Sequence, residues 1–500
     1  MSVMGLGRCP ALGLGAAAAF GSASPDQISR TIGQPAKDCQ VGFVPAKPPK
    51  YLRFAHAALG RLCLRALSLD NFTRLGVSAM EQDQLFERLW NGTASMEEWT
   101  EVVSGGAVTA ISNNIISVHA TYFCGSVTVI RTTAALVLID TAKPDTAAET
   151  LAAVRRWDDR PIHTVIYTLG HIDHTSGVEL IDEEAEARGV PRPRIIAHRN
   201  VLRRLSRYEA SHGFNSIVQG QQFDYPDYVY PVGQRRPDQV YDDTLSLTIG
   251  SERFELFHGR GETDDATFVW LPEHRVLASG DFVIWVFPNA GNPRKVQRYV
   301  PDWAAALRQM QALQPEVLIP GHGPVIFGGE RASQVLDDGA AVLDSLTRQT
   351  LELMSKGRTL DEILHSVRAP AALLAKPYLL PKYDDPEFVV RGIWHLYAGW
   401  FDGNPAHLKP APSAELAGEI AALAGGAATL AGRAKALAEA GKTRLAAHLI
   451  ELASNASPMS AEIQSVRARV YAQCTEAEPS LIAKAIYRVY QRDAEARSSA

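Results

Sequence analysis

The sequence is short of several features that mark whole classes of protein. Its 500 residues include only five cysteines, which are widely spaced and form no CxxC pair, so neither a disulfide scaffold nor a thiolate metal site is expected. No apolar run reaches the length of about 18 residues that a membrane-spanning helix needs. The formal net charge is −5, and a chain without a basic surface is not expected to bind nucleic acid.

Three familiar hydrolase signatures are also missing. The chain has no GxSxG nucleophile elbow and no GxxxxGK[ST] phosphate-binding loop. None of its cysteines stands in an activating context. Serine, nucleotide and cysteine hydrolase chemistry therefore lack the residues that they require.

What remains is the composition of a globular chain. Hydrophobic residues make up 46% of it and charged residues 21%, and its length suits about two or three domains. Residues 1–24 resemble a signal peptide in their single basic residue and their small apolar side chains, but Gly13 and Gly15 interrupt the apolar run. We therefore expect a soluble protein of the cytoplasm, with secretion as the less favoured alternative.

The hydrophobic patterning predicts three parts. Residues 1–105 are expected to form a leader and a helical scaffold. Residues 106–330 alternate short β-branched runs with helical stretches, which is typical of an α/β catalytic domain, and residues 132–135 are expected to form a hairpin turn between two of these runs. Residues 331–500 show amphipathic helices without strand patterns, and Thr359 with Glu362 forms a capping box before one of them.

Side chains able to bind a metal follow four of the expected strands. The segment HIDHT comes shortly after the apolar run HTVIYT, and GRGETDD, ASGDF and PGHGP each end another strand. The candidate ligands are His171, Asp173, His174, Glu262, Asp281 and His322. Loops at strand ends are where an α/β fold places its ligands, and imidazoles with carboxylates suit a divalent metal. The HxDH segment alone is equally well explained as a surface loop. Four strand ends that each carry a metal-capable side chain favour a metal centre instead.

The order HxDH, Glu, Asp, GHG resembles the metallo-β-lactamase superfamily. Within that superfamily, GET at Glu262 in place of the common GHT is similar to the alkylsulfatase branch. So are Asn289 and Arg294 in FPNAGNPRKVQRY, and the segment WFDGNPAHLKP at 400–410 resembles the alkylsulfatase dimerisation domain. The resemblance implies an α/β fold, an αββα sandwich with its metal centre along one edge, followed by an all-α dimerisation domain.

The resemblance also implies a zinc centre of one or two ions. Asp173, His174 and His322 would hold one ion. His171 and Glu262 would hold the other, and Asp281 would bridge both. Asp173, Asp281 and Arg294 are the implied catalytic residues. Metal-activated water would attack a sulfate or other ester whose anionic group Arg294 holds.

Leu169 departs from the family motif HxHxDH, because it stands where the first histidine belongs. An isobutyl group cannot donate an electron pair, so the ion at His171 and Glu262 would lack a ligand. Leu169→His is expected to restore it. Three interpretations stay open: an alkylsulfatase-like metal-dependent hydrolase, a catalytically impaired or non-catalytic homologue with a binding or assembly role, and a single-metal oxidoreductase on the same fold.

The expected partners follow from the same features. An anionic ester of small size is the implied substrate, and no membrane contact is expected. The helical C-terminal part is rich in Ala and Leu and carries the aromatic residues Trp394, Tyr397, Trp400 and Phe401. Because this apolar surface exceeds what a lone appendage would leave exposed, we expect a homodimer.

Overall fold

The structure is a computed structural model that describes residues 79–103, 105–119, 125–225 and 227–499. All of these residues fall within one compact unit. The expected leader lies outside the described residues. The expected N-terminal helical scaffold is described only over the helices α2 (Ala79–Trp90) and α3 (Met96–Val102).

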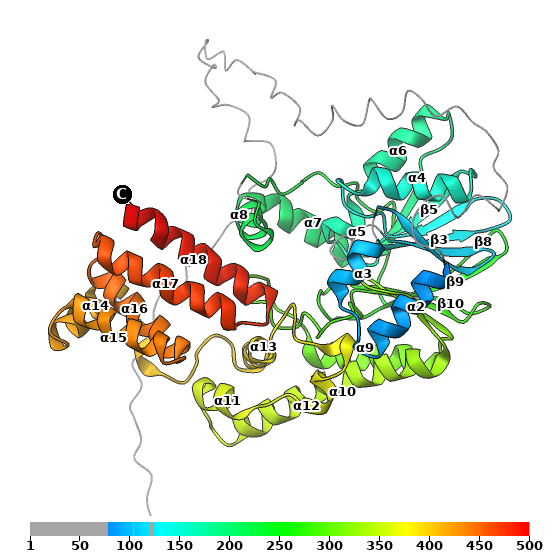
Figure 1. Ribbon diagram of the computed structural model, residues 1–500. Helices are drawn as coiled ribbons and strands as arrows, with labels where there is room; N and C mark the ends of the chain where they lie inside the picture. The colour runs from blue at the N-terminus through cyan, green and yellow to red at the C-terminus, as the bar shows by residue number, and fades with distance from the viewer. Residues whose placement is uncertain (1–78, 104, 120–124, 226, 500) are drawn as a thin grey trace, which may run out of the picture. The chain divides into compact units, whose positions relative to one another are not determined.

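Two β-sheets form the centre of the part that spans residues 107–327 (Figure 1). The first has the strand order β1-β2-β3-β4-β5-β6-β7 and the second has the order β13-β12-β11-β10-β9-β8. The strands of the first sheet are β1 (Ala107–Ser112), β2 (Ile115–His119), β3 (Ser126–Arg131), β4 (Leu136–Ile139), β5 (Ile162–Ile166), β6 (Arg194–His198) and β7 (Gln239–Tyr241). Those of the second are β8 (Thr244–Ile249), β9 (Glu252–His258), β10 (Thr267–Leu271), β11 (Val276–Gly280), β12 (Val317–Pro320) and β13 (Ile326–Phe327).

The inner faces of the two sheets pack against each other. Ile130, Ile139, Phe254 and Val269 belong to this shared core and are almost fully buried. The predicted turn at 132–135 is confirmed, because β3 pairs antiparallel with β4 on either side of it. Alternating apolar residues thus give each strand one face for the inner core.

Helices cover the outer face of each sheet. Helices α4 (Ala147–Trp157), α6 (Val178–Ala187) and α7 (Asn200–Ala210) share a hydrophobic core with the first sheet. Helices α9 (Val300–Ala312) and α10 (Gly329–Ser355) pack on the second (Figure 1). The expected αββα sandwich is therefore confirmed.

The chain after α10 is helical, as expected. It contains α11 (Leu360–Ser366), α12 (Ala371–Leu374), η4 (Pro377–Leu379), α13 (Pro386–Ala398), η5 (Pro405–His407), α14 (Ser413–Leu423), α15 (Ala427–Glu439), α16 (Thr443–Ala456), α17 (Ala461–Ala477) and α18 (Leu481–Ser499). The predicted capping box before α11 is present, with Thr359 and Glu362 exchanging their hydrogen bonds. Helices α14 to α17 share a separate small core. Among the described residues, no helix is both long and apolar enough to cross a membrane.

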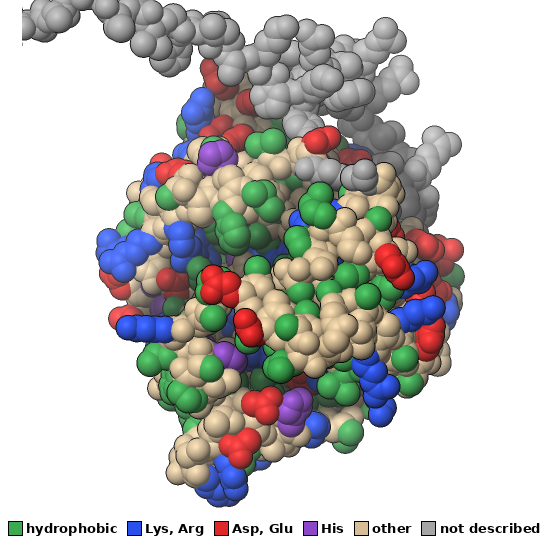
Figure 2. Space-filling model, turned by 90° about the vertical axis from the view of Figure 1, so that its left-hand side faces the viewer, with side chains coloured by type: hydrophobic (Ala, Val, Ile, Leu, Met, Phe, Trp, Pro, Cys, Tyr) green, Lys and Arg blue, Asp and Glu red, His purple; other side chains and the backbone are tan. Residues whose placement is uncertain are grey.

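The surface shown in Figure 2 carries hydrophobic side chains scattered between charged ones. The most exposed large hydrophobic residues of the C-terminal helical part are Leu423, at 89%, and Met459, at 91%. Trp400 and Tyr397, from the predicted aromatic cluster, are also more than half exposed. Trp394 is buried instead, and its indole N–H donates to the carbonyl oxygen of Phe401.

Candidate metal centre

The turn after β5 positions the first candidate ligands. The short helix α5 (Ile172–Thr175) carries Asp173 and His174. At the end of β4, Asp140 has φ +65°, which turns its carboxylate toward the neighbouring loop. Its Oδ2 accepts a hydrogen bond from His174 Nδ1 at 2.8 Å, and its Oδ1 accepts one from the Thr168 backbone at 2.7 Å. This pairing fixes the imidazole so that Nε2 faces the centre.

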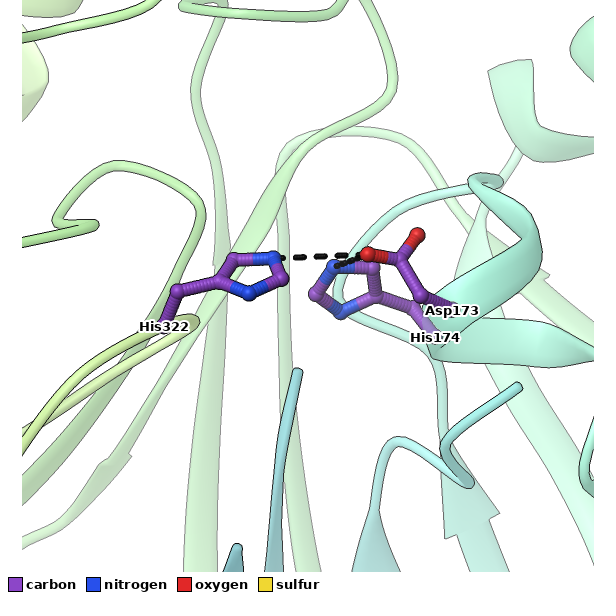
Figure 3. Close-up of side chains that lie close together, drawn as sticks. All are labelled: Asp173, His174 and His322. Atoms are coloured by element: carbon purple, nitrogen blue, oxygen red, sulfur yellow. Dashed lines mark ion pairs between the residues drawn. The ribbon is translucent and has the colours of Figure 1, made fainter. Parts of the chain in front are cut away.

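Strands β11 and β12 supply the next two candidates. They run parallel and end together, so Asp281 and His322 leave the sheet at the same edge. Gly321 is required between them, because a Cβ at that position would collide with the Asp281 carboxylate. Figure 3 shows His322 pointing from the loop after β12 toward Asp173 and His174 on α5. His322 Nε2 lies 3.3 Å from Asp173 Oδ2 and 3.4 Å from Asp281 Oδ1.

We call Asp173, His174 and His322 the first group. Their ligand atoms lie within 4.8 Å of one another. His174 Nε2 also lies 3.3 Å from Asp281 Oδ1, yet both atoms are buried and neither has a hydrogen-bond partner among the described residues. Buried polar atoms normally have partners, so these atoms fit a bound cation. Imidazole and carboxylate donors are those that zinc takes.

The carboxylates and imidazoles of the first group shift one another's pKa values. Burial alone would raise the pKa of Asp173, but His174 and His322 lower it to about 2. Burial would lower the pKa of His174, yet Asp281, Asp140 and Asp173 raise it well above the usual value. The carboxylates thus attract positive charge to this point. A metal ion would supply that charge and displace the protons from the imidazoles.

His171, Glu262 and Asp281 form the second group, and their ligand atoms also lie within 4.8 Å of one another. His171 Nδ1 is 3.7 Å from Asp281 Oδ2. Glu262, however, already has partners: Arg298 Nη1 lies 2.6 Å from its Oε1, and Asn289 donates to the same oxygen. Leu169 is fully buried and offers no donor. This group therefore fits a metal less well than the first.

The structure brings together all six predicted ligands, whose role stays a prediction. Arg294 Nη1 donates to Gln221 at 2.8 Å, and its role in holding an anion stays a prediction. Two cations of the same segment were missed by sequence reasoning, Lys295 and Arg298. Burial lowers the pKa of Arg298 to about 10, so it remains charged at neutral pH. Only the basic character of KVQR signalled them, and it equally indicates a solvated surface.

Comparisons with known proteins agree with this architecture. The profile of the metallo-beta-lactamase superfamily matches residues 123–322, and the profile for alkyl sulfatase dimerisation matches residues 359–497. In both parts, the chain therefore resembles the alkylsulfatase-like branch of the metallo-β-lactamase superfamily.

Its relatives include sulfatases. It is 28% identical over 307 residues to a linear primary-alkylsulfatase of Pseudomonas sp., which covers 57% of this chain and 58% of the relative. It is 27% identical over 349 residues to the alkyl/aryl-sulfatase BDS1 of Saccharomyces cerevisiae, and this match covers 61% of this chain and 51% of the yeast protein. The chain thus spans about half to three fifths of the length of these relatives.

A solved structure shows the same fold. The stereoselective inverting sec-alkylsulfatase Pisa1 from Pseudomonas sp. matches with a TM-score of 0.71 at 22% identity. The match covers 85% of this chain and 69% of that chain. Both the sandwich and the helices that follow it therefore belong to a known arrangement.

Proposed function

We propose that this protein is a metal-dependent hydrolase that cleaves sulfate esters, or closely related anionic esters, of small molecules. The observation that carries the proposal is the first group, whose donors converge with Asp281 at one edge of the sandwich and include buried atoms without partners among the described residues. The two relatives described above are an alkylsulfatase and an alkyl/aryl-sulfatase, which favours a sulfate ester over other esters.

In this proposal Asp173, His174 and His322 hold a zinc ion, and Asp281 lies between them and the second group. A zinc ion there would lower the pKa of a water molecule and polarise the ester oxygen. Asp140 accepts the Nδ1 proton of His174 and so keeps Nε2 directed at the metal.

The anionic group of the substrate requires a cation. Arg294 is the candidate from the sequence, and Lys295 is a second, since it interacts electrostatically with Asp173. Its ammonium has no hydrogen bond or ion pair within the part of the chain that the structure describes. Lys295→Gln is expected to raise KM about tenfold and to change kcat less, because the ammonium holds the anion before and during the reaction.

We also propose that the chain forms a homodimer through its helical part, with the catalytic part near 106–330 and the dimerisation part near 331–500. The match to an alkyl sulfatase dimerisation profile supports this assembly. The exposed Trp400 and Tyr397 are candidate contacts. A strict monomer in sedimentation at micromolar concentration would contradict it.

The activity is tested with zinc-loaded protein and a panel of alkyl sulfate, phosphate and carboxylate esters. We expect release of inorganic sulfate that a chelator abolishes and zinc restores. His174→Ala should be inactive, whereas the matched control His163→Ala should not, because His163 is exposed on β5. Loaded protein that hydrolyses none of these esters would contradict the proposal.

Leu169 favours a second candidate, a non-catalytic homologue with a binding or assembly role. Its side chain is fully buried where the family motif has a histidine. This candidate predicts a folded dimer that binds sulfate esters without turning them over. Equilibrium binding of an alkyl sulfate, measured alongside the hydrolysis panel, separates the two.

A further inference from the structure

The loop between β9 and β10 carries three carboxylates, and the structure pairs each of them with an arginine. Arg298 Nη1 lies 2.6 Å from Glu262 Oε1. Arg204 Nε lies 2.7 Å from Asp265 Oδ2, and Arg204 also contacts Asp264. The two arginines are 4% and 3% exposed, respectively, and Glu262 and Asp265 are also buried, whereas Asp264 is partly exposed.

Arg298 holds Glu262 at two places. Besides the ion pair, its Nη1 donates to the Glu262 carbonyl oxygen at 2.6 Å. Asn289 donates to the same carboxylate oxygen that Arg298 contacts. That oxygen therefore has two donors, and the negative charge of Glu262 is already balanced by a neighbouring cation.

An arginine partner differs from a histidine partner in how it responds to a metal. Asp173 and Asp281 lie against imidazoles, whose ring nitrogens are themselves metal ligands. A guanidinium offers only N–H donors and a permanent positive charge, so it cannot bind a metal ion. A divalent ion at Glu262 would therefore have to approach a permanent positive charge that is buried beside it.

The second group has no reserve of ligands to offset this repulsion. Leu169 is 0% exposed and apolar at the position where a further donor would be needed. Within the part of the chain that the structure describes, the group contains only His171, Glu262 and Asp281. Asp264 and Asp265, the nearest acids in sequence, each give one carboxylate oxygen to Arg204. The other oxygen of Asp265 is buried without a hydrogen-bond partner among the described residues, but Asp265 is not among the convergent ligands of the group.

We propose that Arg298 takes the place of the second metal ion, so that the centre works with one divalent ion and one guanidinium. The ion is bound by the first group and Asp281, and Arg298 supplies the second positive charge. Arg298 Nε is buried without a hydrogen-bond partner among the described residues, which leaves the guanidinium a donor for an oxyanion. This inference rests on the proposed hydrolase function, which it makes more specific.

The test is the zinc content of the full chain. The protein is equilibrated with excess Zn²⁺, separated from unbound metal by gel filtration, and analysed by atomic emission. We expect about one zinc per chain, where a two-metal site would hold about two. A wild-type content of two overturns the inference whatever the variants show.

Two variants remove the ion pair that Arg298 forms with Glu262 of the second group. Arg298→Gln frees Glu262, and the double variant Leu169→His with Arg298→Gln adds a donor, so the content should rise to about two zinc ions per chain in the double variant. Cobalt-substituted protein gives an independent readout, since two adjacent Co²⁺ ions couple magnetically. A folded double variant that stays at one metal contradicts the role of Arg298.

Arg155→Gln is the matched control, because Arg155 makes a comparable pair with Glu184 between α4 and α6, away from the centre. It should leave the zinc content at that of the wild type. Two zinc ions with sulfate release would refute only this inference. One zinc without hydrolysis of any ester would refute the proposed function and leave the single-metal site intact, and a chain that binds no zinc would refute both.

Discussion

The two groups of the centre differ in what balances their carboxylates. Asp173 and Asp281 lie against histidines, whereas Glu262 lies against Arg298. Protons can leave the first set when a metal arrives, but the guanidinium remains in the second. The ligand atoms converge to within 4.8 Å in both groups, but we expect the first group to bind a metal ion more tightly than the second.

The largest expected effect separates the two groups by their histidines. His174→Ala should abolish measurable zinc binding. Loss of a residue that only hydrogen-bonds to a metal ligand lowers metal affinity by about 10- to 100-fold, and loss of the ligand itself should lower it further. His171→Ala should leave about one zinc per chain. Calorimetric titration with Zn²⁺ measures both, with His163→Ala as the control. Equal losses in the two variants would contradict the distinction.

Glu262→Gln should affect stability instead of metal content. It leaves the buried Arg298 without a counter-charge, which costs about 3 to 5 kcal/mol of unfolding free energy. Glu98→Gln is the control, since its pair with Arg88 is exposed and worth less than about 1 kcal/mol. Urea unfolding gives the stability and atomic emission gives the zinc. A stable variant that has lost zinc would place Glu262 among the metal ligands.

Asp140→Asn tests the hydrogen bond by which Asp140 orients His174 of the first group. We expect zinc affinity to fall by about 10- to 100-fold, because the carboxylate no longer fixes the Nδ1 proton of His174. Asn tolerates the positive φ of this position, so the backbone should keep its shape. Competition with a chelator measures the affinity. Unchanged zinc affinity would show that the orientation of His174 does not depend on Asp140.

The smallest expected effect is that of Leu169→His alone. The sequence by itself predicts that this change restores a second ion, but the pair of Glu262 with Arg298 leads us to expect a zinc content that stays near one per chain. Atomic emission on the folded variant checks it. A content of two would show that the missing histidine alone limits the second group.

The sequence predicted much of this fold because its signals are local. The hairpin at 132–135, the capping box at Thr359 and the metal-capable strand ends each depend on a few adjacent residues. Strands β7 and β13, of three and two residues, were missed because they are too short to show alternation.

The arginine pairs of the centre could not be predicted in the same way. Arg298 is 36 residues from Glu262, and Arg204 is 61 residues from Asp265. Only the tertiary fold brings them together. The choice between a ligand and an ion pair for Glu262 therefore depends on the structure.

Anomalous diffraction at the zinc edge, from crystals soaked in Zn²⁺, tests the unequal centre most directly. We predict one peak in the site, within bonding distance of His174 Nε2, His322 Nε2 and the Asp173 carboxylate, with Arg298 still paired to Glu262. A second peak of similar height bonded to His171 and Glu262 would contradict this account.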